Sequence, residues 1–205
     1  MGAMSNCPSS ARARFAVAVC LLISAALVTP SGPRAAAVAA FDSLAAGLAY
    51  ASATGRPEYS DYWQSGQGIE AFLNTPFYWG KVHVGVRYLR NTGDTPSLDY
   101  DSAFMYAGWS AHVRLPRSLS LEPGLSCGGT VMSFDTDPES GNQLETEVAV
   151  ELFVRLAIPV HGRWQLAAVA GWNTILTYNR IDLAVFSIGV SRELSMPGWM
   201  RGFLE

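Results

Sequence analysis

The sequence predicts an all-β fold, namely an eight-stranded antiparallel up-and-down transmembrane β-barrel that follows a cleaved signal peptide. Three observations predict it: a short apolar segment near the N-terminus, segments that alternate with period two, and connections that alternate between long loops and tight turns. The 205-residue chain is 49% hydrophobic and 15% charged, with a net charge of -3 and three Cys. These values argue against a disordered tail protein, a basic nucleic-acid binder and a disulfide-rich secreted module.

The first 39 residues have the pattern of a secretory signal peptide. Arg12 and Arg14 precede an apolar run over 15–28, and Ala37 and Ala39 form an A-x-A cleavage site. The run is shorter than the roughly 20 residues that a spanning helix needs. We therefore predict export through a Sec-type signal with cleavage after Ala39, or alternatively after Ala37. An uncleaved N-terminal anchor is the competing interpretation.

The predicted domains are a signal peptide over 1–39, a barrel over 40–194 and a C-terminal tail over 195–205. The tail is expected to be periplasmic, either as a short interfacial helix or as a frayed terminus. Cleavage would remove Cys7 and Cys20. A disulfide within the mature chain would then be impossible.

Period-two alternation is clearest over residues 144–158, where Glu145, Glu147, Glu151 and Arg155 all fall on one face. A strand places such charges on one side, whereas a helix distributes them around its circumference. The same alternation predicts eight strands, over 44–53, 68–77, 81–90, 103–115, 119–134, 144–158, 164–178 and 184–194. Gly128 and Gly129 fall inside one of them, where we expect a bulge or bend.

The connections suggest how the barrel is oriented. Long polar loops are expected over 54–67, 91–101 and 135–142, and tight turns near Pro76 and over 116–118 and 159–163. In outer-membrane barrels the short turns face the periplasm. A short link near Asn179 breaks this alternation.

The distribution of residue types between the two faces favours a membrane barrel over a soluble, lipocalin-like one. The charged faces are also rich in Gly and Ser, which suits a narrow interior, while the opposite faces carry Val, Leu and Trp. We therefore predict a polar lumen filled by side chains, with charges that nearly balance. Its predicted members are Glu70, Lys81, His83, Arg87, Arg114, Glu122, Glu145, Glu147, Glu151 and Arg155.

With these features the chain resembles the small outer-membrane barrels of Gram-negative bacteria, of the OmpA, OmpX and OmpW type. The resemblance covers 41 to about 194 and is architectural, without a diagnostic motif. It implies an outer-membrane location, contact with membrane lipid and lipopolysaccharide, and assembly by the barrel-assembly machinery. Members usually end at a Phe or Trp that closes the last strand, whereas here Leu194 ends it. The series Phe186, Ile188, Val190 and Leu194 could still serve as the assembly signal.

The sequence predicts a non-enzymatic protein without a cofactor or metal, which acts in structure or surface contact or passes small apolar solutes. One alternative is a lipid A-modifying enzyme, for which Ser110 and His112 within reach of Glu151 are the candidate triad. Another is an accessory subunit of a larger outer-membrane complex. Asp135, Asp137 and Glu139 form an acidic loop run, which is usually solvated.

Overall fold

The computed structural model describes residues 41–55, 63–93, 99–134, 143–178 and 180–195, together with Gly198. The signal segment, the acidic loop run and nearly all of the tail lie outside these residues. The strands are β1 (Ser43–Gly55), β2 (Gly66–Phe77), β3 (Gly80–Asn91), β4 (Tyr100–Ala111), β5 (Val113–Arg114), β6 (Ser120–Phe134), β7 (Gln143–His161), β8 (Trp164–Ile175) and β9 (Ile181–Ser195).

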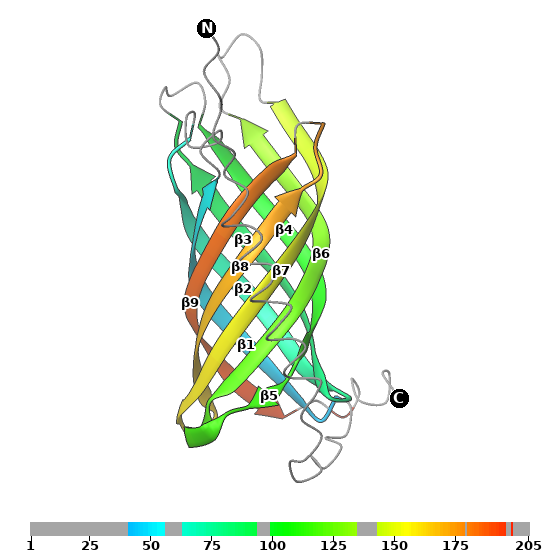
Figure 1. Cartoon of the computed structure of the whole chain (residues 1–205), viewed down its shortest axis with the longest axis vertical. Helices are drawn as coiled ribbons and strands as arrows, with labels where there is room; N and C mark the ends of the chain where they lie inside the picture. Colours follow the sequence, from blue (N-terminus) through cyan, green and yellow to red (C-terminus); the bar gives the residue numbers. More distant parts are fainter. Residues whose placement is uncertain are drawn as a thin grey trace, which may run out of the picture. The chain divides into compact units, whose positions relative to one another are not determined.

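These strands form one closed antiparallel barrel (Figure 1). Strands that follow one another in the chain pair with each other, except for β4 and β5. In addition β1 pairs with β9, and a pairing between β4 and β6 completes the ring. The two residues of β5 continue β4 along the same partner strand after a break at His112. The wall therefore has eight strands, and the predicted up-and-down barrel is confirmed.

Short connections gather at one end of the barrel, which we call the turn end. They are a turn at Tyr78 and Trp79, a 3-10 helix over Pro116–Ser118, and a turn at Gly162 and Arg163. Gly162 has a φ of 56°, a conformation that glycine adopts without strain. The opposite, loop end carries the connections that leave β1, β3, β6 and β8.

Two local expectations are corrected. The segment predicted as one strand over 103–115 is interrupted at His112, and Gly128 and Gly129 keep a regular register with both neighbouring strands. The irregularity lies instead between Pro159 and His161 in β7. Proline lacks the N–H that the strand ladder requires, so a bulge near the strand end accommodates it.

The wall is apolar on the outside. In β7, Leu152 is 51% exposed, while its neighbours Glu151 and Phe153 are 3% and 7% exposed. Outward side chains on other strands follow the same rule, including Leu48, Ile69, Val84, Val86, Met105, Leu125, Val148, Phe186, Ile188 and Val190. Among the described residues there is no helix long and apolar enough to cross a membrane.

Candidate functional site

The barrel interior contains the charged residues that the period-two pattern places on one face. The register sets Glu70 beside Arg87 on β2 and β3, and Glu122 beside Arg155 on β6 and β7. Glu151 on β7 is paired in register with Asn173 on β8. Neighbouring strands thus place charged and polar side chains side by side, in addition to the contacts that cross the lumen.

Arg87 forms the centre of the first group, the Arg87 cluster, whose other members are Glu70, Tyr106, Glu151 and Asn173. Its guanidinium donates to both oxygens of Glu151, at 2.5 and 3.0 Å, and to Glu70 at 3.3 Å. Tyr106 donates its hydroxyl to Glu70, and Asn173 donates to Glu151 at 3.2 Å. Because Arg87 is 3% exposed, these bonds replace water for a fully buried charge.

Glu122 forms the centre of the second group, the Glu122 cluster, closer to the turn end. One of its oxygens accepts from Lys81 Nζ at 2.5 Å and from Ser120 at 3.5 Å, and lies 3.1 Å from His112 Nδ1. Arg155 approaches the other oxygen at 3.9 Å. Together the two clusters hold three carboxylates and three Lys or Arg side chains, so their formal charges balance.

Aromatic rings fill the space between the clusters, and glycine makes room for them. Phe72 lies in register between Gly47 and Gly85, and the ring of Phe72 occupies the position that a Cβ on Gly47 would need. The guanidinium of Arg155 stacks over that ring, 4.7 Å from its centroid, from the opposite side of the barrel.

The same arrangement recurs twice. Tyr106 lies between Gly85 and Gly128, and Phe153 lies between Gly124 and Gly171. A side chain larger than hydrogen would collide with the ring or with the neighbouring backbone at Gly85, Gly124 and Gly128, and would be a tight fit at Gly171. The glycine-rich inner faces therefore serve to fit large rings into a narrow lumen.

His83 is packed into this layer without a polar partner. It is 2% exposed, its ring meets Phe153 edge-on at 5.0 Å between centroids, and neither ring nitrogen has a hydrogen-bond partner among the described residues. Its position opposite Gly108 in the register leaves room for the imidazole. The contacts are those of a packing residue.

The loop-end half of the interior holds a cluster of buried apolar side chains, which we call the apolar cluster, beside a few buried polar residues such as Asn91 and Asp182. The sequence pattern predicts only polar side chains there. Trp63, at the loop end, packs against this cluster and meets Tyr100 edge-on at 5.8 Å. The buried members with the largest side chains are Leu89, Tyr100, Phe104, Tyr106, Met132, Ile175, Leu183 and Val185. The sequence pattern does not reveal this cluster, because its Leu, Val and Met are residue types that also face outward.

The predicted lumenal residues separate into three groups. Six are buried or nearly so and belong to the two clusters: Glu70, Lys81, Arg87, Glu122, Glu151 and Arg155. His83 is buried beside them, and Glu147 is half-buried. Arg114 and Glu145 are exposed, because they lie at opposite ends of the barrel where solvent reaches the inner face.

The turn end holds a small open pocket of about 300 Å³. Lys81, His112, Arg114, Ser120 and Gln165 contribute its polar lining. Its lining residues Lys81, His112 and Ser120 all contact the carboxylate of Glu122. The pocket therefore borders the Glu122 cluster, whose side chains fill the adjoining part of the lumen.

The candidate catalytic triad is not assembled. His112 contacts Glu122, whereas Glu151 is bound by Arg87 and Asn173. Ser110 is 1% exposed, so a lipid substrate could not reach its hydroxyl in this arrangement. Within the described ranges, no group of three His, Cys, Asp or Glu side chains could hold a metal ion.

The sequence matches no family model and no curated protein. Solved structures do share its fold. Neisserial surface protein A matches with a TM-score of 0.56 at 15% identity, over 73% of this chain and 95% of that one. A major outer membrane protein from Thermus thermophilus matches with a TM-score of 0.52 at 11% identity, over 73% and 99%.

The solid-state NMR structure of the outer membrane protein AlkL in DMPC bilayers also matches, with a TM-score of 0.51 at 11% identity over 83% of this chain and 98% of that one. The chain therefore has the fold of the small outer-membrane β-barrels.

Proposed function

We propose that this protein is an outer-membrane barrel that does not conduct, and that it serves as a structural or surface-contact protein through the loops at its loop end. The observation that carries the proposal is the distribution of side chains across the wall. Apolar side chains point outward and charged ones point inward, which is the reverse of a soluble barrel.

The outer surface has a composition that water does not favour. Monomeric soluble proteins rarely expose contiguous apolar patches larger than a few hundred Å². Here large apolar side chains such as Leu48, Ile69 and Val148 are each more than half exposed, on strands all around the barrel. A bilayer satisfies such a surface, and the antiparallel ring leaves no strand edge unpaired.

The interior supports a closed lumen. The Arg87 cluster bridges β3 and β7, and the Glu122 cluster bridges β3 and β6 nearer the turn end. Nearer the loop end, Met132 and Ile175 of the apolar cluster are 1% and 3% exposed. Passage of ions or of small apolar solutes along the barrel axis would require these layers to separate.

The orientation follows from the lengths of the connections. With short turns toward the periplasm, the loop end faces outward, toward lipopolysaccharide and any outer-membrane protein partner. The outward series Phe186, Ile188, Val190 and Leu194 in β9 is then what the barrel-assembly machinery would read. Arg192 interrupts this series on the same face.

Conductance of the refolded barrel in a planar bilayer tests the proposal. We expect no discrete current steps at voltages at which a porin incorporated in parallel gives open channels. Reproducible steps from wild-type protein would contradict a closed lumen. Hydrolysis or acyl transfer on labelled lipid A would contradict the non-enzymatic role, and Ser110→Ala and His112→Ala variants would then identify the residues responsible.

A further inference from the structure

The outer wall is hollowed on one side by an apolar groove of about 1060 Å³. Its shape follows from side-chain size, because Ala46, Ala71 and Ala107 are small outward residues among larger ones such as Leu48 and Leu73. The groove crosses β8, β9, β1, β2, β3, β4 and β6, and its lining includes the outward, exposed side chains of Leu48, Leu73 and Val84, so it lies on the outer wall and not in the lumen.

One cross-strand row runs the length of this groove. In register order it consists of Arg192, Ala46, Leu73, Val84, Ala107 and Cys127. Five strand spacings of roughly 4.8 Å give about 24 Å along the wall, and a strand tilt of roughly 40° converts this to a rise of about 15 Å. That rise is half of the roughly 30 Å hydrocarbon thickness of a bilayer. Along the bilayer normal, the groove therefore extends over the thickness of about one leaflet.

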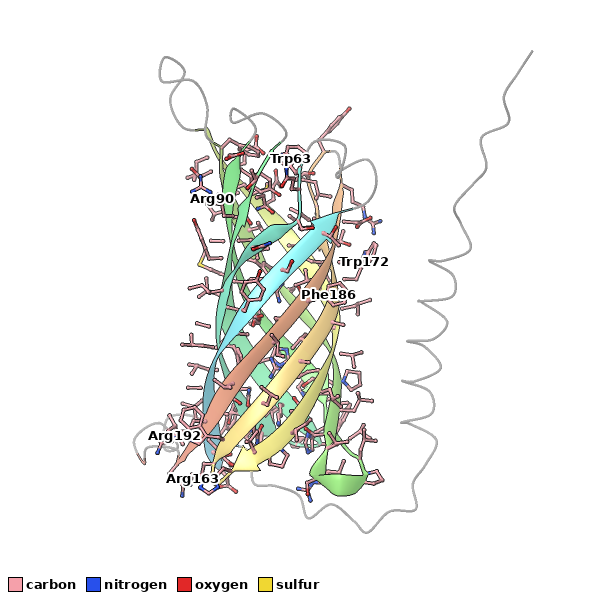
Figure 2. The ribbon with its side chains drawn as sticks, turned by 90° about the vertical axis from the view of Figure 1, so that its left-hand side faces the viewer. Trp63, Arg90, Arg163, Trp172, Phe186 and Arg192 are labelled. Carbon is pink, nitrogen blue, oxygen red and sulfur yellow. The ribbon has the colours of Figure 1, made fainter. Side chains whose placement is uncertain are left out.

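The positively charged side chain of Arg192 lies at the turn-end edge of this groove. Arg192 is exposed on the outer face, and its guanidinium lies 5.6 Å from the ring centroid of Trp164, its partner in the β8–β9 register. Figure 2 shows Arg192 and Arg163 at the end opposite Trp63 and Arg90. Trp and Arg together are typical of the level of lipid headgroups.

Arg192 has no carboxylate partner among the described residues, although Arg87, Arg155 and Arg180 each lie within 4 Å of one. Glu193 follows it in β9 and points to the other face of the strand. A guanidinium matches the geometry of a phosphate and forms paired hydrogen bonds with it. An anionic lipid headgroup of the membrane would provide Arg192 with a partner of opposite charge.

We propose that this groove binds one anionic glycerophospholipid from the turn-end leaflet. Its phosphate pairs with Arg192 beside Trp164, and one acyl chain lies along the row toward Cys127. The inference rests on the proposed function, because the groove must face lipid. It adds a specific lipid site to a wall that would otherwise contact lipid without preference.

Native mass spectrometry of the detergent-solubilised barrel tests this site. Titration with phosphatidylglycerol should show a first lipid bound about tenfold more tightly than phosphatidylethanolamine. Arg192→Gln should remove that preference, whereas Arg90→Gln, which alters an exposed arginine at the loop end, should retain it. Equal retention of the two lipids by wild-type protein would overturn the proposal.

Filling the groove provides a second test. Ala107→Phe should weaken binding of the first phosphatidylglycerol about tenfold, while Ala170→Phe, an exposed outward position on β8 outside the groove, should leave it unchanged. Equal effects of both variants would overturn the proposal. So would a dimer that Ala107→Phe dissociates, since that result assigns the groove to a second copy of the chain.

These outcomes separate the site from the proposed function. Each variant is first checked for heat-modifiable gel mobility, which reports a folded barrel. A folded, membrane-embedded barrel without lipid preference would refute only the lipid site. A soluble protein would refute both.

Discussion

Arg87 and Glu151 form an ion pair across the lumen, between two strands that are not neighbours in the barrel. Arg87 lies on β3 and Glu151 on β7, with β4 and β6 between them, and two N–H donors of the guanidinium meet both carboxylate oxygens at 2.5 and 3.0 Å. Both side chains are at most 4% exposed. A buried pair of this kind contributes little compared with an apolar pair, but removing one partner leaves an unpaired buried charge.

Replacement of Arg87 should therefore be costly. We expect Arg87→Met to lower the free energy of unfolding by about 3–5 kcal/mol, because Glu70 and Glu151 lose their cation. The measurement is urea-induced unfolding in lipid vesicles, followed by Trp fluorescence. Arg90→Met, at a 60% exposed side chain, should change stability by less than about 0.5 kcal/mol. The double variant Arg87→Met with Glu151→Met should recover part of the loss, and a loss equal to the sum of the single effects would contradict a direct pair.

The adjacent glycines of β6 should respond in opposite ways to the same substitution. Gly128 faces inward, where a Cβ would overlap the backbone carbonyl of Met105, so Gly128→Ala should cost about 1–3 kcal/mol. At Gly129 the nearest atom to a Cβ is 4.0 Å away, so Gly129→Ala should be close to neutral. Refolding yields of the two variants into detergent micelles compare them directly. Equal yields would show that the backbone at Met105 leaves room for a methyl group at Gly128.

A charge on the outer wall distinguishes a membrane barrel from a soluble one. Leu152 lies midway along β7 and points outward, so Leu152→Arg should cost about 2–4 kcal/mol at the bilayer midplane. Val160→Arg, outward near the turn end, should cost about 0–1 kcal/mol. The readout is the free energy of unfolding in lipid vesicles. If Leu152→Arg instead improved the solubility of a stable protein without detergent, the outer face would be in contact with water.

The thiol of Cys127 reports both processing and burial in lipid. Cleavage of the predicted signal peptide removes Cys7 and Cys20, so the mature protein should carry one thiol per chain. Cys127 is exposed on the outer wall, near the middle of β6. In vesicles it should react with an apolar maleimide and resist a charged one until the barrel is unfolded. Intact mass gives the cleavage site, and rapid labelling by the charged reagent in folded protein would contradict the lipid-facing position.

The sequence was sufficient for the wall of the barrel because its inner and outer faces differ in residue type along each strand. Glu151 and Leu152 illustrate this, since one carries a charge and the other a branched apolar chain. The buried charges Glu70, Arg87 and Arg155 were also among the predicted set. Their partners were not predictable, because contacts across the lumen depend on the stagger of strands that are far apart in the sequence.

The remaining differences have similar physical causes. Leu89 and Met132 line the loop-end interior although their types are equally suited to lipid, so composition alone does not place them. The glycines beside Phe72 and Phe153 have a role only when the register is known. Arg114 and Glu145 have the parity of lumenal residues, and only the positions of the strand ends show that solvent reaches them.

Gel mobility with and without heating, combined with fractionation of the cell envelope, tests whether the protein is a closed barrel embedded in the outer membrane. We expect a band in the outer-membrane fraction that migrates faster before boiling than after it, because the closed barrel stays compact in detergent. A band of unchanged mobility in the soluble periplasmic fraction would contradict a membrane barrel, since it would place the apolar wall in water and not in lipid.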